Sequence, residues 1–168
     1  MNDVKSRTLA NVRGSLVLAV MTALLVLGLA GPVAAADQVP FKGSLEGTVT
    51  TTPLIPPLAS VLIEGVGNAT HLGRFTVAIP HLVNQAIRVG EGAYVFTAAS
   101  GDTLTADFTG QATLVEGVIS TIETATITGG TGRFVGASGS FVAERTFVLA
   151  TGVTTGSFEG TISRPGKG

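Results

Sequence analysis

The chain carries, at Gly43-Ser44-Leu45-Glu46-Gly47-Thr48-Val49, a heptapeptide that returns almost unchanged at Gly156-Ser157-Phe158-Glu159-Gly160-Thr161-Ile162. The two copies differ only by Leu for Phe and by Val for Ile, which are both apolar exchanges. In each copy the large apolar residue, a glycine and a β-branched residue occupy alternate positions, and this is the spacing of a β-strand. The repeat therefore predicts matching first and last strands that pair with each other and close a barrel.

The first 36 residues have the features of a secretory signal peptide. The basic residues Lys5, Arg7 and Arg13 precede an apolar run at 15–29, and Ala34-Ala35-Ala36 supplies the small residues of a cleavage site. We therefore predict cleavage after Ala36 and a secreted protein, either extracellular or periplasmic. The alternative is an uncleaved membrane anchor, although the apolar run is slightly short of the roughly 20 residues that a span requires.

Residues 37–168 have the length of one ordinary domain, and the composition excludes several classes of protein. The whole chain has 10 Lys and Arg against 11 Asp and Glu, and a formal net charge of −1. It carries no basic stripe, so we expect no binding of nucleic acid. Because the chain has no cysteine, a disulfide framework is excluded and stability must come from the core and from strand pairing.

Runs rich in Thr, Val, Ile and Phe recur between Gly-rich breaks, and no long helical periodicity is present. They predict eight strands, at residues 41–50, 60–66, 69–79, 92–99, 103–114, 118–128, 140–149 and 155–163. This regular spacing favours an all-β fold, an eight-stranded antiparallel barrel, with a β-sandwich as the alternative. The prolines within 51–58 predict a loop across one barrel end. The stretch 80–92 is open to two interpretations, a helical turn or a ragged strand.

Alternation divides the faces of the predicted strands. Leu104, Ala106 and Phe108 alternate with threonine and aspartate, which indicates an apolar inner face and a wet outer face. The turn at 100–102 predicts a hairpin, because Gly101 accepts the positive φ that such a turn demands.

The segment 129–141, GGTGRFVGASGSF, resembles the GGTG-x-F-x-x-A-x-G segment of plant dirigent proteins, whose topology allene oxide cyclases share. A similar segment, with an element like Thr70-His71-Leu72-Gly73, occurs in many exported bacterial proteins of unknown role. The resemblance implies an eight-stranded antiparallel barrel of the calycin type with a central cavity, and it allows a homo-oligomer, because dirigent and cyclase relatives form trimers. Ser138 stands where dirigent proteins usually carry Arg, so their ligand-contacting and catalytic residues are not transferred to this chain.

Four polar residues are predicted to face the barrel interior, namely His71, Tyr94, Glu123 and Arg145, since each alternates with apolar residues. Together they form a candidate site for a small polar or acidic ligand, and Glu123 with His71 is a candidate acid–base pair. The structural alternative is that Glu123 and Arg145 pair at a barrel end and that His71 is a core residue, because a buried charge needs a partner. His71 and His81 are spaced poorly for a metal site, and we predict no metal and no cofactor.

Three functions are compatible with these features. We favour a secreted barrel that holds a small, largely apolar ligand or acts as a scaffold, without catalysis, because no phosphate loop or nucleophile elbow is present. A structural or adhesive surface protein built on Thr-rich strands is the second. A dirigent-like or cyclase-like enzyme that steers a reactive apolar intermediate is the third. The expected partners are the small ligand and further copies of the chain, with no nucleic acid and no membrane after cleavage of the signal peptide.

Overall fold

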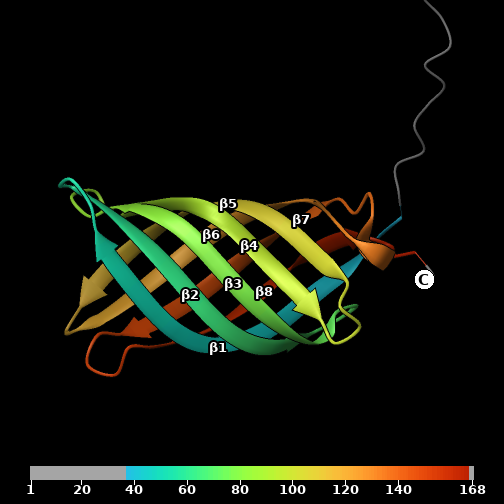
Figure 1. The fold of residues 1–168 in the computed structure, drawn as a ribbon, viewed down its shortest axis with the longest axis horizontal. Helices are drawn as coiled ribbons and strands as arrows, with labels where there is room; N and C mark the ends of the chain where they lie inside the picture. The colour runs from blue at the N-terminus through green and yellow to red at the C-terminus, as the bar shows by residue number, and fades with distance from the viewer. Residues whose placement is uncertain (1–36, 167–168) are drawn as a thin grey trace, which may run out of the picture. The chain divides into compact units, whose positions relative to one another are not determined.

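The computed structural model describes residues 37–166, so the predicted signal peptide at 1–36 lies outside the described residues. The chain forms eight strands and one short 3-10 helix, η1 (Figure 1). Their bounds are β1 Gln38–Pro53, β2 Leu58–Ala69, β3 Gly73–Asn84, β4 Val89–Ala98, β5 Thr103–Val115, β6 Val118–Gly130, η1 Gly132–Phe134, β7 Gly139–Val148 and β8 Val153–Ser163. Within 37–166, no helix has the length and hydropathy to cross a membrane.

The strands pair antiparallel with their neighbours in chain order, and β1 pairs with β8 to close the barrel. The two heptapeptides lie side by side in this seam, with Leu45 opposite Gly156 and Gly43 opposite Phe158. Each large apolar residue therefore faces the first glycine of the other copy. A Cβ atom on Gly43 would lie 2.5 Å from Cζ of Phe158, so the ring occupies the space that a side chain would need. The predicted seam and the barrel are confirmed, and the β-sandwich alternative is wrong.

All eight predicted strands are present, and most are longer than predicted. The start of β3, which was predicted at residue 69, lies instead at Gly73, because the chain turns at 70–72. The Oγ1 atom of Thr70 stabilises that turn by accepting from the N–H of Lys42, at 3.0 Å, and donating to the carbonyl of Pro40, at 3.1 Å. The undecided stretch 80–92 continues β3, turns at 85–88 and begins β4.

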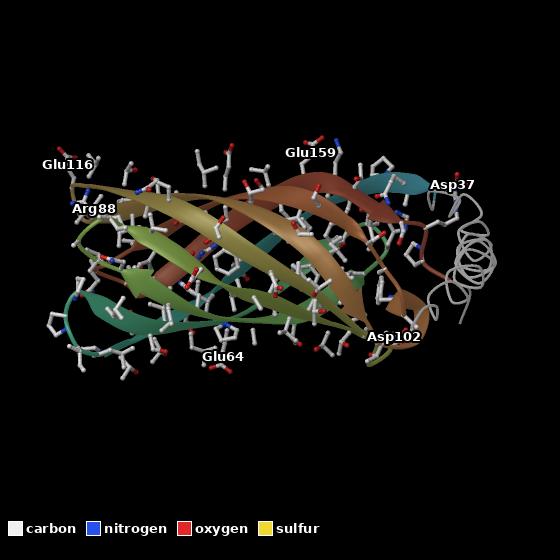
Figure 2. The ribbon with its side chains drawn as sticks, turned by 90° about the horizontal axis from the view of Figure 1, so that it is seen from above. Asp37, Glu64, Arg88, Asp102, Glu116 and Glu159 are labelled. Atoms are coloured by element: carbon white, nitrogen blue, oxygen red, sulfur yellow. The ribbon has the colours of Figure 1, made fainter. Side chains whose placement is uncertain are left out.

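The predicted faces and the predicted hairpin are also confirmed. Leu104, Ala106 and Phe108 are buried, whereas Glu64 and Glu159 project from the outer wall in Figure 2. Gly101 has a φ of 89°, and its N–H donates to the carbonyl of Ala98 at 2.9 Å. The proline-rich stretch forms a turn at one end of the barrel, as predicted, but the turn is shorter than the predicted 51–58. Residues 54–57 join β1 to β2, and Pro53 is the last residue of β1, opposite Ala59.

The turns define two different ends of the barrel, which lie opposite each other in Figure 1. The end with the turns 70–72 and 99–102 and with η1 is called the closed end. The end with the turns 54–57, 85–88, 116–117 and 149–152 is called the open end. The half next to the closed end is filled by aromatic rings in mutual contact, and we call it the aromatic half. Its rings belong to Phe41, Phe75, Phe96, Phe141 and Phe158.

Candidate functional site

The half of the barrel next to the open end contains a cavity of about 270 Å³. Inward-facing positions from seven strands line it, and most are aliphatic or small. The wall residues include Val49, Ala59, Val61, Ile63, Val83, Gly90, Gly110, Ala112, Leu114, Ile119, Thr121 and Phe147. The cavity exists because these inward positions carry smaller side chains than the equivalent positions in the aromatic half. A larger hollow of about 870 Å³ lies on the outer wall, but mostly outward-facing residues line it.

Glu123 from β6 and Arg145 from β7 form an ion pair on the floor of this cavity. Both side chains are buried, at 2% and 6% exposed. The Nε atom of Arg145 donates to Oε2 of Glu123 at 3.1 Å, and its Nη2 atom donates to Oε1. Arg145 stands opposite Thr121 in the register, one inward step from Glu123, so the pair is a diagonal cross-strand pair. The pairing that was predicted as an alternative is therefore confirmed, on the cavity floor and not at a barrel end.

Two glycines make room for the ion pair. A Cβ atom on Gly110 would lie 2.6 Å from Cγ of Glu123, and a Cβ atom on Gly156 would lie 2.4 Å from Cγ of Arg145. Gly156 belongs to the second heptapeptide, so the repeat that closes the barrel also admits the guanidinium. The Glu123 charge and its hydrogen bonds outweigh the burial that opposes the charge of Arg145, and they raise the pKa of the guanidinium.

Tyr94 lies directly under the floor. Its hydroxyl donates to Oε2 of Glu123, and its ring stacks on Phe96 at 5.4 Å between centroids, which connects the floor to the aromatic half. Burial raises the pKa of the phenol, and the charge of Glu123 raises it further, so Tyr94 remains a proton donor. It is buried and does not line the cavity, in contrast with its predicted role as a contact of the ligand.

The prediction that His71 faces the interior is wrong. His71 is exposed in the turn 70–72 at the closed end, with a φ of 65°, and so it cannot pair with Glu123. The prediction assumed that strand alternation extended into the residues that form this turn. Leu72, which is buried, takes the place next to the core.

His81 is the histidine that reaches the cavity, and sequence reasoning missed it. Its Nδ1 atom lies 2.9 Å from the carbonyl of Ile79, so Nδ1 carries the proton, because a carbonyl only accepts. Burial lowers the pKa of this imidazole, and the charge of Arg145 lowers it further, against the opposing influence of the Ile79 carbonyl and of Glu123. The neutral ring therefore offers Nε2 as a hydrogen-bond acceptor. Its alternation with Val77 and Ile79 was the available signal, but the predicted strand ended before Pro80.

The floor thus offers a ligand one donor group and one acceptor. Among the described residues, Arg145 uses Nε and Nη2 for Glu123, which leaves Nη1 without a protein acceptor. His81 supplies the acceptor. The structure brings together Tyr94, Glu123 and Arg145 of the four predicted residues and replaces His71 by His81. Within 37–166, no group of three His, Asp or Glu side chains is placed to hold a metal ion.

The arrangement of the strands is similar to that of two solved structures, the pterocarpan synthase dirigent proteins PsPTS1 and GePTS1. With PsPTS1 the TM-score is 0.56 at 12% identity, over 78% of this chain and 97% of that chain. This chain has the dirigent fold. With GePTS1 the TM-score is 0.54 at 12% identity, over 84% of this chain and 99% of that chain. No protein-family model matches the sequence, and no curated protein does.

The likeness confirms the dirigent-like barrel that the segment 129–141 implied. Ser138, where the chain departs from the dirigent pattern, lies exposed at the closed end, and its backbone N–H donates to Oγ of Ser163 at 3.0 Å. It does not line the cavity. The exchange at this position therefore does not alter the polar floor of the cavity.

Proposed function

We propose that the barrel is a non-catalytic binding module that holds a small, largely apolar molecule in the open-end cavity. An uncharged polar group of the molecule sits on the floor, between Nη1 of Arg145 and Nε2 of His81. The observation that carries the proposal is the cavity itself, an apolar hollow with a polar floor in a barrel whose other half is filled. Small-molecule sites are typically apolar pockets with a few convergent polar groups.

The volume limits the size of the ligand. A cavity of 270 Å³ exceeds the roughly 150 Å³ that accommodates benzene, and it falls just below the range of about 300–1,000 Å³ for drug-sized ligands. The ligand is therefore one or two rings or a short alkyl chain.

The charge balance of the floor favours a neutral ligand. On the floor, Glu123 already neutralises Arg145, so a second carboxylate there would lose its hydration without gaining an unpaired cation. Arg88 also lines the cavity, but it is exposed in the turn at the rim, where pairing with a carboxylate contributes little. A hydroxyl or carbonyl group can instead accept from Nη1, and a hydroxyl can also donate to His81.

The hydrogen bonds of Glu123 favour binding over catalysis. Its oxygens accept from Nε and Nη2 of Arg145 and from the hydroxyl of Tyr94. A general base needs an oxygen within reach of the substrate proton, and these bonds occupy the carboxylate from two sides. The closed barrel also removes the free strand edges that an adhesive assembly would use. Residues 1–36 support a site of action outside the cytoplasm.

Tyr94 makes a direct test of binding possible, because it is the only tyrosine of a chain without tryptophan. Its fluorescence reports on the cavity floor alone. We would titrate the protein with octan-1-ol and with octanoate, which have equal chains and different head groups and do not absorb near 280 nm. We expect a saturable change with octanol and at least tenfold weaker binding of octanoate.

Two variants of β5 serve as a matched pair. Ala112→Phe fills the cavity from an inward position and is expected to abolish the response, whereas Thr109→Phe points outward and is expected to retain it. If both variants retained the same fluorescence change with octanol, the alcohol would bind elsewhere. Native mass spectrometry of protein recovered from its secretion medium, compared with the denatured sample, would then give the mass of the natural ligand.

A further inference from the structure

Three of the four turns at the open end carry an exposed aliphatic side chain, and the exposed Val115 at the end of β5 immediately precedes the fourth turn, 116–117. We call this set the mouth ring. Its members are between 44% and 85% exposed and comprise Leu54, Ile55, Ile87, Val115 and Leu149. Single exposed aliphatic residues are ordinary on protein surfaces, but a set of them at or next to four successive turns around one opening forms a patch.

The closed end differs in composition. Its turns present Thr70, His71, Ser100 and Asp102, and in the segment 135–138 between η1 and β7 only Val135 is an exposed large aliphatic. The barrel is therefore polarised along its axis, with apolar tips around the mouth of the cavity and polar tips at the other end.

The turns that form the mouth ring have almost no net charge. The turns 54–57, 85–88, 116–117 and 149–152 contain two charged residues, Arg88 and Glu116, and these have opposite signs. Figure 2 shows both at the same end of the barrel, with Asp37 and Asp102 at the opposite end. The ring therefore suits an apolar surface without net charge more than it suits an anionic one.

Backbone hydrogen bonds at the rim join the four turns in two pairs and connect two of them to neighbouring strands. The N–H of Gln85 donates to the carbonyl of Pro57 at 2.9 Å, and that of Leu149 donates to Gly117 at 3.0 Å. Two further bonds connect turns to strands: the N–H of Ala112 in β5 donates to the carbonyl of Arg88 at 2.9 Å, and that of Val49 in β1 donates to the carbonyl of Gly152 at 3.1 Å. The tips can thus enter an apolar medium while these backbone groups remain paired, which insertion into lipid requires.

We propose that the mouth ring docks the barrel on the surface of a lipid bilayer, with the cavity opening toward the acyl chains. The ring continues into the cavity through Leu114, which is exposed at the rim and also lines the wall. Beyond the tips the outer wall carries polar residues, at Thr52, Thr113 and Thr146, and also exposed aliphatic residues, at Leu58, Leu82 and Val153. This docking differs from the expectation of no membrane contact. Exchange of a ligand with the bilayer rests on the proposed function, whereas docking rests on the ring.

The shape of the ring favours a bilayer over a protein partner. Its side chains stand on separate tips around an opening, and the four turns contain none of the aromatic residues that often anchor protein interfaces. Aliphatic tips that enter the interfacial region of a bilayer need no matching shape on the other side.

The test is flotation with vesicles of phosphatidylcholine alone, with the protein as recovered from its secretion medium. The variant Ile55→Ser/Ile87→Ser removes two tips, and Val66→Ser/Val142→Ser removes two exposed valines from the outer wall. We expect the parent and the wall variant to float equally, and the ring variant to partition at least tenfold less. We expect 0.5 M NaCl to leave binding unchanged.

Three results would overturn the proposal: equal flotation of ring and wall variants, loss of binding in salt, or a parent dimer that the ring variant converts to a monomer without vesicle binding. The Tyr94 fluorescence of each variant verifies its fold, and Val115→Ser repeats the test if the double variant unfolds. Octanol titration separates the two proposals, because the ring variant should bind octanol and Ala112→Phe should still float.

Discussion

The two halves of this barrel share the same eight strands and the same alternation, yet one is filled and the other is hollow. In β5 the inward residues are Leu104 and Ala106 in the filled part, Phe108 at its border with the cavity, and Gly110 and Ala112 beside the cavity. The strand geometry is common to both halves, so the size of the inward side chains decides the difference. A barrel of eight strands can be filled by side chains or can leave room for one small ligand, and this barrel is filled in one half and hollow in the other.

The comparison assigns different tasks to the two halves. The aromatic half, with Phe96 in contact with the rings around it, provides stability. The half next to the open end is less densely packed and contains a buried ion pair. Such a pair contributes little net stability compared with apolar residues of the same volume. Departures from the rules of stable packing are expected where a protein has a function.

The largest difference in unfolding free energy between the two halves is expected from replacing one phenylalanine in each half. Phe96→Ala should lower the free energy of unfolding by about 3–5 kcal/mol, because it leaves a cavity among fixed rings. Phe147→Ala should cost about 1 kcal/mol, since this half-buried side chain borders a hollow that already exists. Urea denaturation followed by circular dichroism measures both. Equal losses would mean that the two halves are packed alike.

The second-largest effect on the free energy of unfolding is expected from breaking the ion pair on the cavity floor. Glu123→Gln leaves the buried guanidinium of Arg145 without its counter-charge, and we expect a loss of about 3 kcal/mol. The double variant Glu123→Leu/Arg145→Met removes both charges and should recover most of that loss. A double variant as unstable as the single one would show that the carboxylate acts through its packing and not through the ion pair.

Two glycine-to-alanine variants compare the packing of the seam with that of the cavity wall, because each adds one methyl group. At Gly43 in the seam a Cβ atom would lie 2.5 Å from Phe158, and Gly43→Ala should cost about 1–3 kcal/mol by overpacking. At Gly90 the nearest atoms would be 3.6 Å away, and its φ is not positive, so Gly90→Ala should stabilise the protein by about 0.4–1 kcal/mol. Urea midpoints at constant m-value decide between these outcomes, and destabilisation by Gly90→Ala would contradict an open cavity.

The smallest effect concerns pH. Burial and the nearby charge of Arg145 lower the pKa of His81 below 6.5, so the unfolded chain binds more protons than the folded one as the pH falls through this range. The contribution of His81 to stability is therefore complete above 6.5 and is lost below it. His81→Gln should flatten the decline in unfolding free energy between pH 7 and about 5.5, a window in which most carboxylates stay ionised. His71→Asn, at an exposed position, should retain the slope.

Much of this structure could be predicted because its signals are local. The repeat of Gly43–Val49 at Gly156–Ile162 predicted the seam, and alternation predicted the inner faces and the buried pair of Glu123 and Arg145. The errors occurred where a strand begins or ends. Periodicity does not show that the chain turns at His71, nor that β3 continues through Pro80 to bring His81 inside.

The sequence by itself determined that the chain is an all-β barrel with apolar residues inside, because strand spacing and the inner face follow from the alternation of side-chain types along each strand. Only the tertiary structure decided which half is hollow, which histidine reaches the floor and that aliphatic side chains at or next to four turns gather around one opening. These features depend on strand register and on side chains that meet from distant parts of the chain. A shift of one residue in register would have exchanged inside for outside.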